Sequence, residues 1–189
     1  MRAPGSRRPI RALLAVGVAL LCAVPASAFR ESGATRGAPA ALTVVVPERI
    51  PVECVQVAAF DYSVPAMLLL AMLKVESGGR SVVSSNANGT QDIGMAQHNS
   101  ASWVPYLERR YGITANDLLR SPCQSIRAQA YVLRREINTR ECGGFDLWCG
   151  VARYHSPGNV HARKRYVARV HGALAEILES GRFEPRGVR

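Results

Sequence analysis

The sequence predicts a mainly α-helical domain, and three observations lead to this prediction. The chain has 189 residues with 48% hydrophobic content, which is enough for one globular domain with a buried core. Apolar residues recur at helical spacing over most of residues 52–179, and few stretches alternate as strands do. Only residues 84–99 are rich in turn-forming residues, so we expect at most a small β-hairpin or a turn-rich loop there.

Seven helices are expected, and local signals mark some of their ends. Pro65 suits a first helical turn, because proline lacks the N–H that a first turn leaves unpaired, and Gly78 suits a helix end. The Asn-Gly pair in "SSNANGTQDIG" (84–94) indicates the turn of the small β element. The expected helices are residues 52–62, 65–77, 101–111, 115–120, 123–139, 147–154 and 162–179.

The beginning of the chain is typical of a cleaved export signal. Four arginines precede the acid-free apolar run "ALLAVGVALLCAV", which ends in "PASA" before Phe29. We therefore expect a periplasmic or extracellular protein with no stable membrane span after cleavage, the alternative being an uncleaved anchor. The expected order is a signal peptide (1–28), a flexible linker (29–48), the folded domain (49–178) and a C-terminal tail (179–189).

Export changes how the cysteines are interpreted, because disulfides persist outside the cytoplasm. The mature chain would keep four cysteines, which allow three pairings. They form no C-x-x-C motif and have no histidine pair at ligand spacing beside them, so no metal site is predicted. We favour Cys54 with Cys123, which joins the start of the domain to its middle, and Cys142 with Cys149, which closes a short glycine-containing turn.

The chain is basic, with a formal net charge of +10. Removing the signal segment takes away four arginines and no acid, which leaves 20 basic and 14 acidic residues and a net charge of about +6. The sequence has no glycine-rich phosphate loop and no base-stacking aromatic motif, so we do not expect nucleic-acid binding. A solvated basic face and attraction to an anionic polymer such as the cell wall both account for the charge.

Glu76 is the strongest candidate for a catalytic residue. Apolar residues lie three, four and seven positions before it, so it falls on the apolar stripe of its helix and should be at least partly buried. Burial and the nearby helix C-terminus both raise the pKa of a carboxyl group, which suits a general acid. The alternative is a surface pair with Arg80, but the two glycines between them interrupt the helix that such a pair requires.

Three motifs in a fixed order give the sequence a resemblance to a known family. "ESGG" (76–79) is followed by "NANGTQDIGMAQHN" (86–99) and "GVARYHSP" (150–157). Together they resemble the soluble lytic transglycosylase (SLT) family of the lysozyme-like superfamily, especially its small exported members associated with conjugation, pilus and secretion machines. The resemblance covers residues 52–170 and implies a goose-type, lysozyme-like α-helical domain.

The resemblance also implies a substrate and a set of site residues. The substrate is the glycan strand of peptidoglycan, cut at the β-1,4 bond between N-acetylmuramic acid (MurNAc) and N-acetylglucosamine (GlcNAc). Glu76 matches the family's catalytic acid and Ser77 the serine beside it. Gln97 and Asn99 match polar residues of the family's G-L-M-Q-I-N segment, and Tyr154 matches its late cleft tyrosine, whose hydroxyl would orient Glu76 or a sugar. Ser77, Gln97, Asn99 and Tyr154 are therefore expected to bind substrate.

Some of these residues also have a structural alternative. Gln97 and Asn99 can stabilise their loop by bonding to its backbone, and Tyr154 can be a core residue. The segment reads "GMAQHN" here and departs from the family pattern at three positions, one of which is His98, a residue expected near the cleft.

The implied reaction needs one carboxyl group and no cofactor or metal. Protonated Glu76 would donate its proton to the glycosidic oxygen and then act as a base. The C6 hydroxyl of the muramic acid would attack C1 and form a 1,6-anhydro ring, a step favoured by its proximity.

Two other functions stay open from the sequence. Asp92 follows Glu76 by 16 residues, which resembles the second carboxylate of animal C-type lysozymes and would make the protein a hydrolytic muramidase. The structural alternative for Asp92 is to hold the turn at residues 88–94 through short side-chain bonds. The third hypothesis is a non-catalytic, wall-binding assembly factor of a type III or type IV secretion or conjugation machine.

Overall fold

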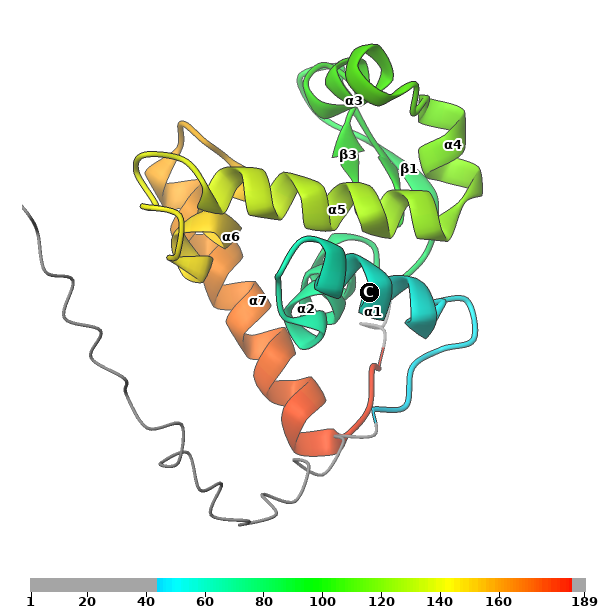
Figure 1. The fold of residues 1–189 in the computed structure, drawn as a ribbon, viewed down its shortest axis with the longest axis vertical. Coiled ribbons are helices and arrows are strands. Elements are labelled where there is room, and N and C mark those ends of the chain that lie inside the picture. Colours follow the sequence, from blue (N-terminus) through cyan, green and yellow to red (C-terminus); the bar gives the residue numbers. More distant parts are fainter. Residues whose placement is uncertain (1–43, 185–189) are drawn as a thin grey trace, which may run out of the picture. The chain divides into compact units, whose positions relative to one another are not determined.

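The computed structural model describes residues 44–184, which form seven helices and one three-stranded sheet (Figure 1). The predicted mainly α-helical class is therefore confirmed. The predicted signal peptide and most of the predicted linker lie outside the described residues. Every helix begins and ends within two residues of its expected bounds: α1 Val52–Asp61, α2 Ala66–Glu76, α3 Trp103–Tyr111, α4 Ala115–Arg120, α5 Pro122–Ile137, α6 Leu147–His155 and α7 Val160–Ser180.

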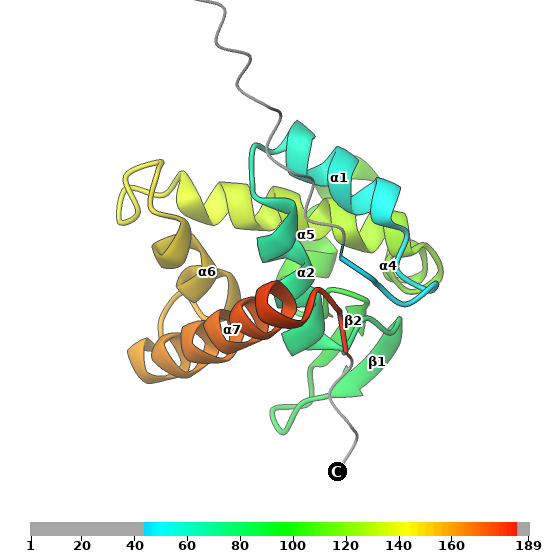
Figure 2. The ribbon, with the colours of Figure 1, turned by 90° about the horizontal axis from the view of Figure 1, so that it is seen from below.

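Helix α2 is the centre of the core because it is apolar on every side. Residues 68–74 are all buried, and α1, α5 and α7 pack against the helix (Figure 2). Lys74 is the one charged residue in this run, and its Nζ lies 2.7 Å from Oε1 of Glu176 in α7. Burying each large apolar side chain stabilises the fold by about 1.5–3 kcal/mol. This burial holds α2 in place and so fixes the position of its last residue, Glu76.

The apolar character of α2 does not make it a membrane span by itself. No single helix in residues 44–184 is long and apolar enough to cross a membrane. Helices α1 and α2 have the required length and composition only when they are counted together, and the chain bends by 120° between them.

The sheet is antiparallel, with the order β1 (Val82–Ser85), β2 (Gln91–Gly94) and β3 (His98–Asn99). The expected Asn-Gly turn joins β1 to β2: Gly89 has a φ of +79°, and the N–H of Asn86 donates to the Thr90 carbonyl at 2.8 Å. Asp92 and Asn99 lie opposite each other in the pairing of β2 with β3. The sheet therefore gathers polar side chains from the turn and both strands.

Two disulfides link the helices with the favoured pairing. Cys54 of α1 is joined to Cys123 of α5, and Cys142 is joined to Cys149 at the start of α6. The first disulfide joins cysteines 69 residues apart in the sequence. Because it restricts the conformations of the unfolded chain, a loop of this length should stabilise the fold by about 4 kcal/mol. The second closes only seven residues, so its main effect is on the local shape of the loop before α6.

The folded domain extends beyond both of its predicted boundaries. Val45 forms a β-bridge with Arg182: its N–H donates to Gly181 O at 2.9 Å, and its carbonyl accepts from the N–H of Phe183 at 2.8 Å. Phe183 is buried, and α7 continues to Ser180. Residues 44–48 and 179–183, expected as linker and tail, are thus part of the domain, because a bridge of one residue pair leaves no periodic pattern in the sequence.

Candidate active site

Glu76 is the last residue of α2, where the chain leaves the core. Gly78 and Gly79 follow with φ values of +63° and +73°, a left-handed conformation that ends the helix. The side chain is partly buried and faces a cleft of about 430 Å³. The cleft is lined otherwise by residues from the sheet and its turns, the start of α3 and the end of α6: Asn86, Asn88, Thr90, Asp92, Gln97, His98, Asn99, Ser102, Trp103, Tyr154, His155 and Pro157.

Burial raises the pKa of Glu76 from 4.5 to about 7. The negative charge of Asp92 acts in the same direction, whereas a hydrogen bond from Tyr166 and the positive charge of Arg169 oppose the rise. A carboxyl group with this pKa is protonated in a large fraction of molecules at neutral pH and can also hold a negative charge. Glu76 can therefore both donate and accept a proton.

Tyr166 is the direct partner of Glu76. It is fully buried in α7, and its hydroxyl donates to Oε1 of Glu76 at 2.5 Å. Its ring stacks on the His155 ring with centroids 4.4 Å apart, and the guanidinium of Arg169 lies 5.5 Å from its centroid. Tyr166 thus fixes the orientation of the carboxyl group while α7 supplies a positive charge nearby.

The tyrosine that bonds to Glu76 is Tyr166, which no sequence motif marks as a site residue, and not Tyr154. Tyr166 lies on the apolar stripe of α7 with Val170 and Ile177, which indicates a core residue. The signal that could have found it is its hydroxyl, since a buried tyrosine hydroxyl needs a hydrogen-bond partner. Tyr154 lines the cleft as expected, but its hydroxyl donates to the Ala96 carbonyl at 2.9 Å rather than to Glu76.

Asp92 lies in the same cleft as Glu76 and is held by two side-chain amides. Asn86 Nδ2 donates to its Oδ2 and Asn99 Nδ2 to its Oδ1, both at 2.9 Å. The bonds of Asp92 therefore reach beyond the turn at residues 88–94, to Asn86 before it and Asn99 after it, and the position of Asp92 also lets its charge act on Glu76.

Gln97 and Asn99 line the cleft while their amide nitrogens bond within the protein. Gln97 has a φ of +53°, and its Nε2 donates to the carbonyls of Val82 and Gly94 at 3.1 and 2.8 Å. Asn99 Nδ2 donates to Thr90 as well as to Asp92, and its Oδ1 accepts from the N–H of Ala101 at 3.0 Å. The backbone alternative thus accounts for both Nε2 bonds of Gln97, whereas Asn99 bonds mainly to other side chains.

Ser77, which the resemblance predicts to bind substrate, is not among the residues that line the cleft. Its side chain is buried, donates to the Met95 carbonyl at 2.7 Å and accepts from the N–H of Arg80 at 3.1 Å. Because both bonds stay within the protein, Ser77 ties the end of α2 to the segment after β2.

The two cleft histidines differ in their surroundings. His98 is almost completely buried, its Nε2–H donates to the Ser125 carbonyl at 3.0 Å, and burial lowers its pKa to about 4. His155 is only partly covered, by the Tyr166 ring on which it stacks among other contacts; this partial burial and the charge of Arg169 lower its pKa as well. Among residues 44–184 no cluster of histidine, cysteine or acidic side chains is placed to hold a metal ion.

The pH dependence of activity should follow Glu76. Since the acid must be protonated, kcat/KM should fall as the pH rises through about 7, where the raised pKa lies. Arg169→Gln removes a positive charge that lowers the pKa of Glu76, so the pH at which kcat/KM falls should move to a higher value. Arg165→Gln, one helical turn earlier, is the control and should leave the pH at which kcat/KM falls unchanged. A wild-type profile flat from pH 5 to 9 would contradict the assignment.

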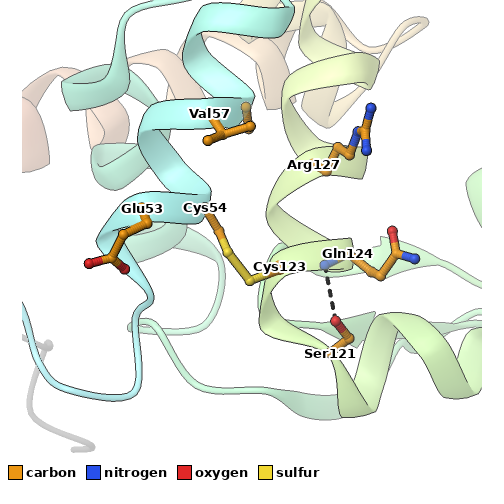
Figure 3. A pocket seen from close by; sticks show the side chains of 8 residues that line it. Glu53, Cys54, Val57, Ser121, Cys123, Gln124 and Arg127 are labelled. Atoms are coloured by element: carbon orange, nitrogen blue, oxygen red, sulfur yellow. Dashed lines mark hydrogen bonds between the residues drawn. A yellow bond between two sulfur atoms is a disulfide. The ribbon is translucent and has the colours of Figure 1, made fainter.

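A second hollow lies between α1 and α5 beside the first disulfide (Figure 3). Glu53 is the only acid in its lining, and its two cysteines are bonded to each other, which removes any nucleophilic thiolate. We therefore assign the chemistry to the cleft that contains Glu76.

Comparison with known proteins agrees with this assignment. The family model for the transglycosylase SLT domain matches residues 53–172, a segment that contains Glu76, the rest of the cleft lining and Tyr166. No curated protein matches the chain at a significant level. The match covers more than half of the sequence, so the chain belongs to the transglycosylase SLT domain family, whose lysozyme-like domain acts on peptidoglycan.

Proposed function

We propose that the protein is an exported lytic transglycosylase that cleaves the MurNAc–GlcNAc β-1,4 bond and leaves a 1,6-anhydro-MurNAc end. The observation that carries the proposal is Glu76, a single carboxyl group with a pKa of about 7 at the end of a buried helix, facing the polar cleft. The match to the SLT family supports the substrate class.

Glu76 first acts as the acid. Tyr166 donates to Oε1, which leaves Oε2 to carry the proton toward the glycosidic oxygen. As the bond between C1 and that oxygen breaks, the oxygen takes the proton and Glu76 becomes a carboxylate. The Tyr166 hydroxyl and the positive charge of Arg169 both stabilise this carboxylate.

Glu76 then acts as the base. The C6 hydroxyl of the same MurNAc attacks C1, and its proton passes to the carboxylate, which restores the acid. No water is consumed, because the attacking oxygen already belongs to the sugar. The reaction is intramolecular, so one well-placed carboxyl group is sufficient.

Asp92 favours one second candidate, a hydrolytic muramidase, because it places another carboxylate in the cleft. In the transglycosylase we propose that this charge stabilises the positive charge that develops at C1. The amides of Asn86 and Asn99 hold both of its oxygens in place for this role.

The products distinguish the two reactions. The anhydro product is one water, about 18 mass units, lighter than the reducing-end product of hydrolysis, and mass spectrometry of digested sacculi measures this difference. Asp92→Asn should keep activity within about tenfold of wild type in a transglycosylase, whereas a hydrolase that uses this carboxylate should lose about 10²–10⁴-fold. Asp146→Asn is the control, since asparagine caps α6 as well as aspartate does. A wild-type digest with only reducing ends would reject the transglycosylase.

We further propose that the enzyme works outside the cytoplasm, where it opens the wall for a secretion, conjugation or pilus apparatus. The signal-like segment and the two disulfides support export, and the resemblance to small exported members of the family supports the link to a machine. Fractionation of cells that produce the full chain tests the location. Complementation of a deletion strain by Glu76→Gln tests the assembly-factor hypothesis, because a non-catalytic factor should work without the acid.

A further inference from the structure

We infer that Arg163 is a positioning residue for the active-site cleft, held in turn by Glu141, which directly precedes the loop that the Cys142–Cys149 disulfide closes. The inference rests on the proposed function, because the wall that Arg163 holds is the wall of the Glu76 cleft. It gives the second disulfide a function in substrate binding as well as in folding.

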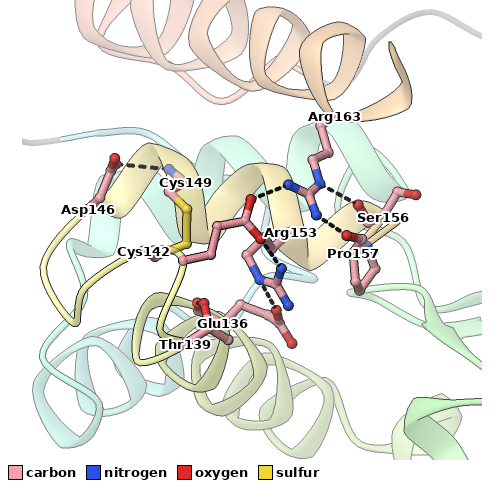
Figure 4. A network of polar contacts seen from close by, with 10 residues as sticks. Glu136, Thr139, Cys142, Asp146, Cys149, Arg153, Ser156, Pro157 and Arg163 are labelled. Carbon is pink, nitrogen blue, oxygen red and sulfur yellow. Dashed lines mark hydrogen bonds and ion pairs between the residues drawn. A yellow bond between two sulfur atoms is a disulfide. The ribbon is translucent and has the colours of Figure 1, made fainter. Parts of the chain in front are cut away.

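The first step is the contact of Arg163 with the backbone after α6. Its Nε donates to the Ser156 carbonyl at 2.8 Å, and its Nη2 donates to the Pro157 carbonyl (Figure 4). The planar fork of a guanidinium suits two successive carbonyls, and its charge is favourable at the C-terminal end of a helix. The Arg163 side chain is only 15% exposed, so water competes weakly for these bonds.

The second step is the position of the clamped backbone. Only residues 156–159 connect α6 to α7, and both His155 and Pro157 line the cleft. His155 also stacks on Tyr166, the partner of Glu76. A shift of this short connection would therefore move one wall of the cleft next to the catalytic carboxyl group.

The third step leads from Arg163 to the disulfide. Arg163 Nη1 lies 2.5 Å from Oε1 of Glu141, while Oε2 of Glu141 bonds to Arg153. Arg153 Nε in turn donates to the largely buried Glu136 at 2.8 Å. These charges form a connected network, which holds its members better than an isolated surface pair does (Figure 4).

Glu141 directly precedes Cys142, and this fixes where the network is anchored. The disulfide ties Cys142 to Cys149 at the start of α6, and the Asp146 side chain caps the same helix by accepting from the Cys149 N–H at 2.9 Å. The loop is thus fastened to the beginning of α6, and Glu141 passes this restraint to the backbone beyond the end of the same helix.

The chain offers a matched control for the clamp. Arg134 of α5 also donates to two successive backbone carbonyls after a helix, those of Tyr62 (2.7 Å) and Ser63. Neither of these residues lines the Glu76 cleft. Arg134→Ala and Arg163→Ala therefore remove the same kind of contact, but only the second change loosens a cleft wall.

Kinetics on soluble peptidoglycan fragments test the inference. Arg163→Ala should raise KM at least fivefold with a smaller change in kcat, at a temperature where circular dichroism shows folded protein. Arg163→Lys, which keeps the charge on one donor nitrogen but loses the planar fork, should recover part of the loss. Arg134→Ala should lower the melting temperature to a similar degree and leave KM within twofold. An unchanged KM in Arg163→Ala, or equal KM increases in both alanine variants, would overturn the inference.

Hydrogen exchange supplies a measurement that does not depend on activity. The backbone amides of His155, Ser156, Gly158 and Asn159 should exchange at least threefold faster in Arg163→Ala and in the Cys142→Ser/Cys149→Ser double variant, with little change in α5. Glu141→Gln should give the same result if Arg163→Ala fails to fold. Wild-type protein that does not cleave peptidoglycan would reject the proposed function alone, whereas unchanged exchange at residues 155–159 in all these variants would reject the clamp itself.

Discussion

Glu76→Gln should abolish the cleavage of peptidoglycan and leave the fold intact. Amide and carboxyl groups are similar in size, and the glutamine oxygen can still accept the hydrogen bond from Tyr166. The amide cannot deliver and recover a proton, so the rate should fall by about 10²–10⁴-fold or more. Release of soluble fragments from purified sacculi measures the rate, and circular dichroism measures the fold.

The same variant should change how stability depends on pH. Folding raises the pKa of Glu76 above its usual value of 4.5, so the folded protein retains a proton that the unfolded chain releases. This contribution is present at low pH and is lost as the pH rises through about 7 in the wild type, whereas an amide has no such dependence. Glu76→Gln should thus be more stable relative to wild type at pH 8 than at pH 5, as thermal melts at the two values would measure.

Glu53→Gln is the matched control for the loss of activity. Glu53 lies in the hollow beside the Cys54–Cys123 disulfide, away from the assigned site, so the change should leave the rate within about twofold. Full activity in Glu76→Gln together with a large loss in Glu53→Gln would move the active site to that hollow.

The helices could be predicted closely because each has a local cause. α2 is a run of apolar residues with one lysine, which begins after Pro65 and ends shortly before two glycines, and α6 begins after Asp146, which caps it. The strand β3 has only two residues, and the bridge between Val45 and Arg182 joins opposite ends of the domain. Such short pairings depend on tertiary contacts, so no periodic pattern in the sequence predicts them.

The candidate site was only partly predictable, for a physical reason. Glu76 could be found because a carboxyl group on an apolar helix stripe is unusual and therefore informative. Tyr166 lies 90 residues later, and its role depends on the packing of α7 against α2. The bond between Asp92 and Asn99 depends in the same way on the register of β2 with β3, which the sequence alone does not specify.

Gly94→Ala should be the most disruptive single-methyl change near the cleft. Gly94 has a φ of +83°, and a Cβ atom there would lie 2.3 Å from the carbonyl oxygen of Leu118 in α4. A backbone oxygen cannot move aside as the end of a flexible side chain can, so β2 and α4 would have to separate. The left-handed conformation costs about 1–2 kcal/mol and the overpacking about 1–3 kcal/mol more, so the free energy of unfolding should fall by about 2–5 kcal/mol.

Gly89→Ala separates the two contributions. Gly89 has a nearly identical φ of +79°, but a Cβ atom there would meet nothing within 4 Å. Only the conformational cost should remain, about 1–2 kcal/mol, and denaturant unfolding of both variants measures the difference. Gly94 also begins the segment that carries Gln97, His98 and Asn99 into the cleft, so Gly94→Ala should lose activity even where it remains folded. Equal stability losses in the two variants would mean that close packing against Leu118 does not fix this segment.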